Sequence, residues 1–428
     1  MSNISVIATE TVKRYGDALS HGDFRTLWTA NIFAGAAAWA LIVARGWLVF
    51  DMSDPATASL WVGLVTFAAM IPRVLVTPLT GYLSDRFDRK AVLRVMFVIN
   101  LVNNLVLALL VSTGNIEIWH LVVLSLVNGS ARATQMPAAQ ALIPNLVPRR
   151  TLLNAIALNQ ATMQGSRLLG PAAILPLMLT TGTEGAFFLC AAFYAISLVQ
   201  SLRLRTESTG KVDRQRGLAS NLAEGFVYCY KTPHLRVIIF IALLHCGLTM
   251  SYESLLPILS QQRLGTGGAG VTTLMMAVGA GAMLSSIVLA GVRTEQTRGR
   301  TFFYMGILSG VAPGLMAIST TVPLALLGAA LLGASTAGFM TLTHTMIQST
   351  IPDGVRGRIA GVYSIHVGGT MALANLTNGA LADFTGAPLI FIVGGVLFII
   401  VMTVSLKSFS LRSIYTTGLN PQLQGAAD

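Results

Sequence analysis

The sequence predicts an all-α polytopic membrane protein, with twelve transmembrane helices in two parallel-repeat six-helix bundles. Composition, the recurrence of apolar segments and the placement of basic residues carry this prediction. The 428 residues are 54% hydrophobic and 11% charged, with a mean hydropathy of +0.69. Soluble domains carry about 25% charged residues. We therefore expect most of the surface of this chain to face lipid.

Apolar segments long enough to cross a bilayer, ~20 residues each, recur twelve times along the chain. Lipid offers the backbone no hydrogen bonds, so these segments must be helices. The expected spans are 26–50, 59–82, 91–112, 118–141, 152–179, 185–203, 235–259, 268–292, 301–320, 323–347, 356–383 and 388–408. The polar start before Trp28 lacks the features of a signal peptide, so we expect an uncleaved N-terminus.

Basic residues gather in the loops and tails on one side of the expected membrane. The loops on the other side carry one basic residue, Arg263, and the acids Asp54, Glu117 and Glu184. Cytoplasmic loops are enriched in Lys and Arg. We therefore expect cytoplasmic termini and a location in a bacterial-type cytoplasmic (inner) membrane. The net charge of +11 follows from these loops, and no nucleic-acid partner is expected.

The longest polar interruption divides the chain in its middle. We expect an N-terminal six-helix bundle over 1–203, a cytoplasmic linker over 204–234, and a C-terminal six-helix bundle with a short tail over 235–428. An amphipathic helix in the linker, lying in the membrane interface, is predicted by apolar residues at helical spacing: Leu218, Leu222 and Phe226. A solvated linker is the alternative interpretation.

A weak internal repeat supports this division. Gly129 and Pro148 have the same separation as Gly333 and Pro352, which aligns the fourth expected span with the tenth. Parallel repeats related by an axis along the membrane normal are one of the known architectures of membrane transport proteins.

Polar side chains inside the expected spans recur at helical spacing. Such groups are costly in lipid and usually face a bundle interior or a cavity. We expect a cavity between the halves lined by Asn31, Arg132, Gln135, Gln164, Arg167, His245 and His344. Interhelical hydrogen bonding is the alternative role for each of them.

The arginines inside the spans differ in depth. Arg132 and Arg167 lie too deep to escape to an interface and need an acid, a carbonyl or an anionic ligand. Arg73 lies near mid-membrane on the second expected span. Arg45 is expected to snorkel to the outer interface.

Glu253 is the one carboxylate well inside an expected span, on a face with His245 and Thr249. If a proton is carried, Glu253 is the first candidate for its carrier, with Arg132 as a coupling partner. The alternative is a water-exposed group near the outer mouth.

The run Gly81–Lys90, between the second and third expected spans, combines a glycine, an aspartate and a basic cluster. It resembles the loop between helices 2 and 3 of the major facilitator superfamily of transporters. The resemblance implies a latch between the two halves at the cytoplasmic face. Its expected members are Gly81, Asp85, Arg86, Arg89 and, at the start of the eleventh span, Arg356.

Two further runs, Asn128–Ala138 and Ile143–Arg149, with Gly170-Pro171-Ala172 beyond them, are similar to the subfamily of enterobactin-type siderophore exporters and macrolide efflux proteins. Arg132 with Gln135 resembles the helix-4 motif associated with proton coupling.

A third motif resembles a degenerate helix-5 antiporter motif and consists of Gly165, Gly170 and Pro171. Ala172 and Ala173 stand where that motif has a glycine pair. Ala36 stands where the subfamily often has an acid.

The resemblance implies a secondary active transporter, a proton-coupled exporter of a small amphipathic molecule (drug or siderophore-like) that works by alternating access. An importer or lysophospholipid flippase of the same fold, or a transporter-fold sensor or scaffold, are the alternatives. The basic groups of the fourth and fifth spans suit an anionic or catecholate substrate. The sequence has no nucleotide loop, metal-ligand cluster or nucleophile constellation, so we expect no enzyme, no cofactor and no metal. The expected partners are a small-molecule substrate, protons and the lipid bilayer, with the chain as a monomer.

Overall fold

The computed structural model describes residues 16–76, 87–206, 218–290, 292, 294–351 and 356–418. Helices make up nearly all of the described residues. In the first half they are α2 (Gly22–Met52), α3 (Ala58–Met70), α4 (Pro72–Leu75), α6 (Arg89–Ser112), α7 (Ile118–Leu146), α8 (Arg149–Thr180) and α9 (Gly182–Leu202). In the second half they are α10 (Leu218–Lys231), α11 (Pro233–His245), the π-helix η1 (Cys246–Met250), α12 (Leu256–Ile258), the π-helix η2 (Leu259–Leu264), α13 (Gly267–Ala290), α14 (Glu295–Ile318), α15 (Val322–Thr350), α16 (Arg356–Thr385), α17 (Ala387–Ser405) and α18 (Phe409–Thr417).

The helical membrane fold is confirmed. Within the described ranges, nine helices are long and apolar enough to cross a membrane, or ten if the bent pair formed by α10 and α11 is one span. Within the described residues each expected span coincides with a helix or a series of helices, and residues 77–82 of the second span lie outside them. The count of nine or ten falls short of twelve because α7 and α8 are not included in it. Both are long, but polar residues such as Arg132 and Arg167 lower their mean hydropathy.

The seventh expected span, 235–259, is not one continuous helix. It is divided into α11, η1, α12 and η2, and Ser251–Leu255 between them is not helical. Pro257 explains the position of this break, because in a continuous helix its ring would clash with the carbonyl of Glu253, four residues earlier. The break is buried throughout.

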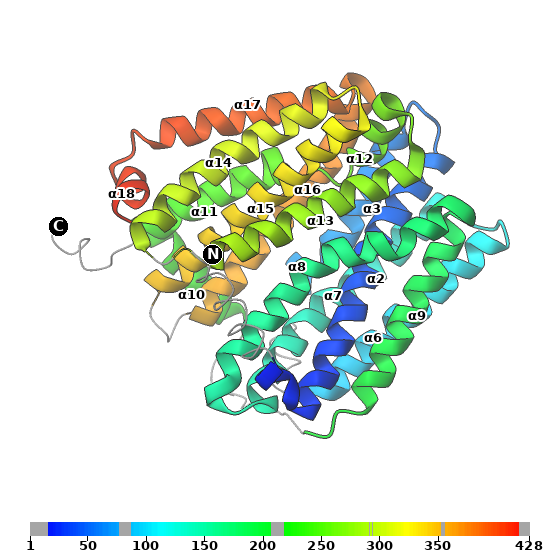
Figure 1. Ribbon diagram of the computed structural model, residues 1–428, viewed down its shortest axis with the longest axis horizontal. Helices are drawn as coiled ribbons and strands as arrows, with labels where there is room; N and C mark the ends of the chain where they lie inside the picture. The colour runs from blue at the N-terminus through cyan, green and yellow to red at the C-terminus, as the bar shows by residue number, and fades with distance from the viewer. Residues whose placement is uncertain are drawn as a thin grey trace, which may run out of the picture.

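The helices gather into two groups (Figure 1). In the first group α2, α3, α6, α7, α8 and α9 pack on one another, and in the second α11 and α13 to α18 do so. The two groups meet mainly along two seams, α3 against α16 and α8 against α13, with smaller contacts from α2 and α4. We call the end where α2 and α6 begin and α9 ends the basic end, since Arg25, Arg94 and Arg203 lie there.

Both seams depend on glycine. A Cβ on Gly63 of α3 would come within 2.8 Å of the carbonyl oxygen of Asn375 on α16. A Cβ on Gly279 of α13 would come within 2.6 Å of the backbone carbonyl carbon of Arg167 on α8. Small residues let membrane helices approach backbone to backbone, so each seam has a close crossing near mid-helix.

The end opposite the basic end is held by a cap between the two groups. The Asp383 carboxylate of α16 accepts hydrogen bonds from the backbone N–H groups of Ser59 and Leu60, both at 2.9 Å. These residues form the first turn of α3, where backbone N–H groups lack partners inside the helix. The cap therefore ties the first group to the second at this end.

The predicted linker helix is present as α10, and it packs on α16. Glu224 pairs with Arg358 at 2.7 Å, and the Tyr230 hydroxyl bonds the Nε2 of His366 at 2.6 Å. The placement of α10 in a membrane interface stays a prediction.

Candidate functional site

The break in the seventh span leaves buried backbone groups without partners in a helix. Two side-chain amides of α16 form hydrogen bonds with them. The Oδ1 of Asn375 accepts from the backbone N–H of Ser254 at 3.1 Å, and Nδ2 of Asn378 donates to the carbonyl of Ser251 at 2.8 Å. Non-helical backbone at membrane depth requires such internal partners. These hydrogen bonds stabilise the break, which places Tyr252 and Glu253 beside the seams.

Glu253 lies in this break with 6% of its surface exposed. Its Oε2 accepts from Nδ2 of Asn375 at 3.3 Å. Arg167 of α8 and Arg73 of α4 both interact with it electrostatically across the seams. A carboxylate from the second group therefore lies within electrostatic range of two guanidinium groups from the first.

Arg167 connects the two groups directly. Its Nη2 donates to the hydroxyl of Tyr252, and its guanidinium lies 4.6 Å from the ring centroid of Trp39. Arg132 lies over the same ring at 5.6 Å. Cations over an indole face are attracted by its negative π-cloud, so Trp39 of α2 holds an arginine from α8 and one from α7.

A small cavity opens beside these arginines, between α2, α3, α4 and α7. Its walls combine polar and apolar side chains: Ile42, Arg45, Gly46, Val65, Thr66, Ala69, Met70, Arg73, Asn128, Gly129 and Arg132. The expectation that Arg45 snorkels to an interface is wrong, because its side chain is 4% exposed and lines this cavity. Packing of α2 against its neighbours encloses it.

Gln135 belongs to a buried amide network. The Nδ2 of Asn128 donates to Oδ1 of Asn100 at 2.7 Å, and Nδ2 of Asn100 donates to Oε1 of Gln135 at 3.3 Å. The network links α6 to α7 inside the first group. Gln135 thus steadies the helix that carries Arg132.

Two other candidates lie on or against α8. Asn31 of α2 donates through Nδ2 to Oδ1 of Asn159 at 3.0 Å. Gln164 is half-buried, one turn before Arg167. Both lie on the α2–α8 side of the first group.

The two histidines lie away from the arginine cluster. His245 is fully buried in the second group, where its Nε2 bonds the Ser309 hydroxyl at 2.8 Å and its ring stacks on Phe339 at 4.4 Å. Thr249 bonds the same hydroxyl at 3.1 Å. The break removes Glu253 from the face that these two residues share. His344 is exposed on α15.

The predicted helix-5 motif includes one tight contact. A Cβ on Gly170 would come within 2.9 Å of the backbone nitrogen of Ala40, so this glycine brings α8 close to α2. Gly165 has open space around it. Pro171 follows within α8.

Most of the predicted latch lies outside the described residues, namely Gly81, Asp85 and Arg86. Arg356 begins α16, and Arg89 begins α6, where its Nη1 donates to the carbonyl of Ala141 at 2.9 Å. The adjacent Asp88 caps α6 by accepting from the backbone N–H of Lys90 at 3.1 Å.

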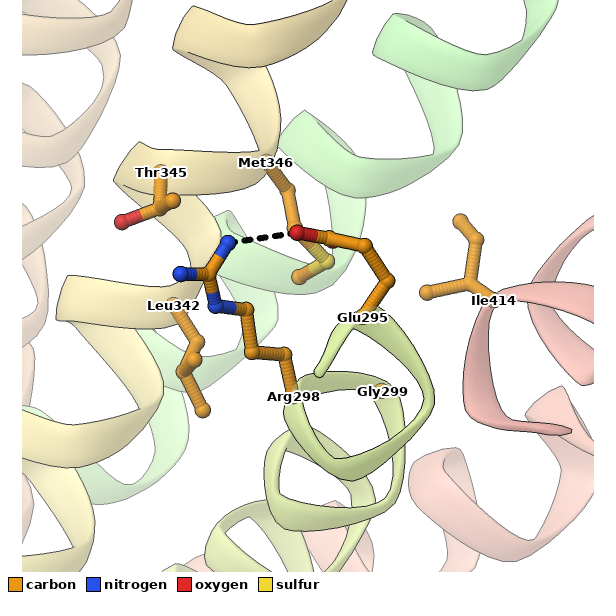
Figure 2. A pocket seen from close by; sticks show the side chains of 7 residues that line it. All are labelled: Glu295, Arg298, Gly299, Leu342, Thr345, Met346 and Ile414. Atoms are coloured by element: carbon orange, nitrogen blue, oxygen red, sulfur yellow. Dashed lines mark hydrogen bonds and ion pairs between the residues drawn. The ribbon is translucent and has the colours of Figure 1, made fainter. Parts of the chain in front are cut away.

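A second pocket lies at the basic end of the second group, between α14, α15 and α18 (Figure 2). Figure 2 shows Arg298 paired with Glu295 of the same helix, at 2.5 Å. The two charges neutralise each other, so the residues that line this pocket carry no net charge with which to bind an ion. Among the described residues, no group of His, Cys, Asp and Glu side chains could hold a metal ion.

A family model described as a transmembrane secretion effector of the major facilitator type, MFS_3, matches residues 17–424. The chain belongs to this family. It is thus a transporter of the major facilitator superfamily, as the loop and helix motifs predicted.

The relatives include a multidrug efflux pump and a staphyloferrin A transporter. The chain is 26% identical over 369 residues to the multidrug efflux pump Tap of Mycolicibacterium fortuitum, covering 83% of this chain and 88% of Tap. It is 22% identical over 361 residues to the staphyloferrin A transporter of Staphylococcus aureus, covering 84% of this chain and 89% of that one.

Solved structures share the fold. A mutant of the nucleoside transporter NupG superposes with a TM-score of 0.72 at 13% identity, over 90% of this chain and 99% of NupG. A POT family transporter superposes with a TM-score of 0.70 at 13% identity, over 90% of this chain and 95% of that chain.

Sequence reasoning missed the residues that complete the site. These residues are Tyr252, Asn375 and Asn378. Two signals were available: amides near mid-span in the eleventh segment, and Pro257 interrupting the seventh.

Proposed function

We propose that this transporter is a proton-coupled exporter of small amphipathic molecules. The observation that carries the proposal is the place of Glu253. It is a buried carboxyl group in a break of the second group, within electrostatic range of Arg167 and Arg73 of the first. A group that can gain and lose a proton at the contact between two rigid halves links protonation to their relative position.

The proposed coupling follows from charge. As a carboxylate, Glu253 attracts Arg73 and Arg167 and favours the arrangement in which the seams are closed around it. On binding one proton it becomes neutral, the attraction is lost, and the arginines are free to interact with another anionic group. Release of that proton on the other side of the membrane restores the attraction and completes an alternating-access cycle. Arg132, which shares Trp39 with Arg167, takes part through the same ring.

The surroundings of Glu253 support an amphipathic cargo. A cluster of Met70, Cys246, Met371 and Ala372 adjoins Asn375, the hydrogen-bond partner of Glu253, and Met250 and Met340 pack against the cluster. Methionine side chains adapt to ligands of irregular shape. The similarity to Tap, a multidrug efflux pump, favours outward transport of such molecules.

We also propose the membrane arrangement that fits this cycle. Residues 1–203 and 235–428 are the two moving six-helix bundles, and 204–234 connects them. The basic end faces the cytoplasm, with both termini, and the membrane is the bacterial inner membrane. A single chain contains the whole transport path.

The test is drug efflux from proteoliposomes in which a pH gradient is imposed or collapsed. For Glu253→Gln we expect efflux that no longer responds to the gradient. The matched control is Asp51→Asn, an exposed acid at the end of α2, which should keep the response. A Glu253→Gln protein whose efflux follows the gradient as the unmodified protein does would exclude Glu253 as the proton carrier.

A further inference from the structure

The cavity between α2, α3, α4 and α7 concentrates positive charge. Arg45, Arg73 and Arg132 line it, each from a different helix, and no Asp or Glu is among the lining residues. Arg132 is close enough to repel both Arg45 and Arg73. Like charges held together in a partly apolar pocket require an opposite charge nearby.

The described residues do not supply enough negative charge to balance these three arginines. In that part of the chain no carboxylate comes within ion-pair distance of Arg45, Arg73 or Arg132. Glu253 interacts electrostatically with Arg73, but it also faces Arg167. One carboxylate shared between two arginines leaves Arg45 and Arg132 uncompensated.

Arg45 adds an independent observation. Its side chain is 4% exposed, and its Nη1 has no hydrogen-bond partner among the described residues. A buried guanidinium nitrogen without an acceptor is costly and rare in native proteins. Because Arg45 lines the cavity, the missing acceptor belongs inside it.

The geometry points to a binding site in this cavity for an oxyanion group, a carboxylate or a phosphate, held by Arg45, Arg73 and Arg132. Planar guanidinium groups donate in pairs to the oxygens of such groups. The Nδ2 of Asn128 is engaged with Asn100, so the arginines provide the recognition. Ile42, Val65 and Met70 form apolar walls of the same cavity.

The site shares Arg73 with the Glu253 contact but differs from it in its other two arginines, Arg45 of α2 and Arg132 of α7. It lies inside the first group, whereas Glu253 acts between the groups. The anion has two possible sources, a free inorganic or organic anion and the anionic group of the transported molecule. The second source rests on the proposed function, and the first does not.

The first arm of the test measures binding to the purified full-length protein without transport. Melting temperatures are compared in sodium phosphate, sodium acetate and sodium chloride at equal ionic strength. Phosphate stabilises many proteins without binding a site, so the decisive quantity is the difference between the unmodified protein and Arg45→Gln. We expect phosphate or acetate to raise the melting temperature of the unmodified protein by at least about 2 °C more than that of Arg45→Gln.

Matched variants separate charge from folding. Arg45→Lys keeps a positive charge and should retain part of the anion-dependent shift. Arg132→Gln should lose it, as a second test if Arg45→Gln folds poorly. Arg263→Gln removes an exposed arginine of η2 and should behave as the unmodified protein. Equal shifts in the unmodified protein, Arg45→Gln and Arg132→Gln would overturn the proposal.

The second arm identifies the source, with cells that export a fluorescent carboxylate or its methyl ester. If Arg45→Gln loses export of the carboxylate at least about 10-fold and keeps export of the ester, the anion belongs to the cargo. If both dyes are affected alike while the first arm is positive, the ligand is a free anion. Export of neither dye by the unmodified protein would count against the proposed function alone, since the binding arm does not depend on it.

Discussion

Asp383 and Ser59 are distant in sequence, yet the carboxylate of the first accepts the backbone N–H of the second at 2.9 Å. Leu60 donates to the other oxygen of the same carboxylate. This is a helix N-cap whose capping residue comes from the other group of helices. An ordinary cap stabilises one helix, whereas this one stabilises a helix only while the two groups are together at that end.

Asp383→Asn tests this cap. An amide offers one acceptor oxygen instead of two and no charge at a helix N-terminus, so we expect a loss of about 0.5–2 kcal/mol for the closed arrangement of this end. Spin labels at Thr113→Cys and Arg263→Cys, exposed positions on the two groups, should report a larger fraction of long distances. Asp54→Asn is the control, since the Asp54 carboxylate accepts from the backbone N–H of Ala56 within its own loop. An unchanged distance distribution in Asp383→Asn would contradict a role in closure.

Tyr252→Phe removes the acceptor of the buried Arg167 Nη2. A buried donor left unpaired costs about 1–3 kcal/mol, so we expect a lower melting temperature of the purified protein. Tyr304→Phe removes an exposed hydroxyl of α14 and should leave the melting temperature unchanged. Equal melting temperatures for the two variants would show that Arg167 does not depend on Tyr252.

Asn375→Asp probes the amide that joins the break to α16. The new carboxylate cannot donate to Glu253 and places a second negative charge 3.3 Å from it if the geometry is kept. We expect export to fall about 10-fold or more while the protein still reaches the membrane. The reason is that a second carboxylate close to Glu253 disfavours the charged form of both groups. The comparison is Asn378→Asp, whose amide serves the carbonyl of Ser251 and not Glu253. Equal export by the two variants would remove Asn375 from the mechanism.

We expect the Glu224–Arg358 ion pair to contribute little to the free energy of unfolding. Its N–O distance is 2.7 Å, but the Glu224 side chain is 49% exposed, and surface ion pairs contribute about 0–1 kcal/mol. We therefore expect Glu224→Ala to change the free energy of unfolding by less than ~1 kcal/mol. Salt titration of the melting temperature checks this, since a weak surface pair is screened at high ionic strength. A much larger loss would indicate that α10 holds α16 in place more firmly than the ion pair alone can.

Three predictions from the sequence differ from the structure. The seventh span was expected to be continuous, and Pro257 with the amides of α16 makes it a break. Arg45 was expected at an interface, and the neighbours of α2 enclose it. His245 was grouped with Glu253, and the break separates them. Each depends on how one helix meets another.

The sequence by itself determined the membrane class, the positions of the helical segments and the superfamily, because composition, hydropathy and short motifs are local properties of the chain. It also identified Arg132, Arg167 and Glu253 as charges that need partners. Only the tertiary structure decided those partners. Tyr252 meets Arg167, Asn375 meets Glu253, and Asp383 caps α3, since the rotation of each helix about its axis and the seams between the groups set which side chains face one another. Glycines such as Gly63 and Gly279 allow the helices to come that close.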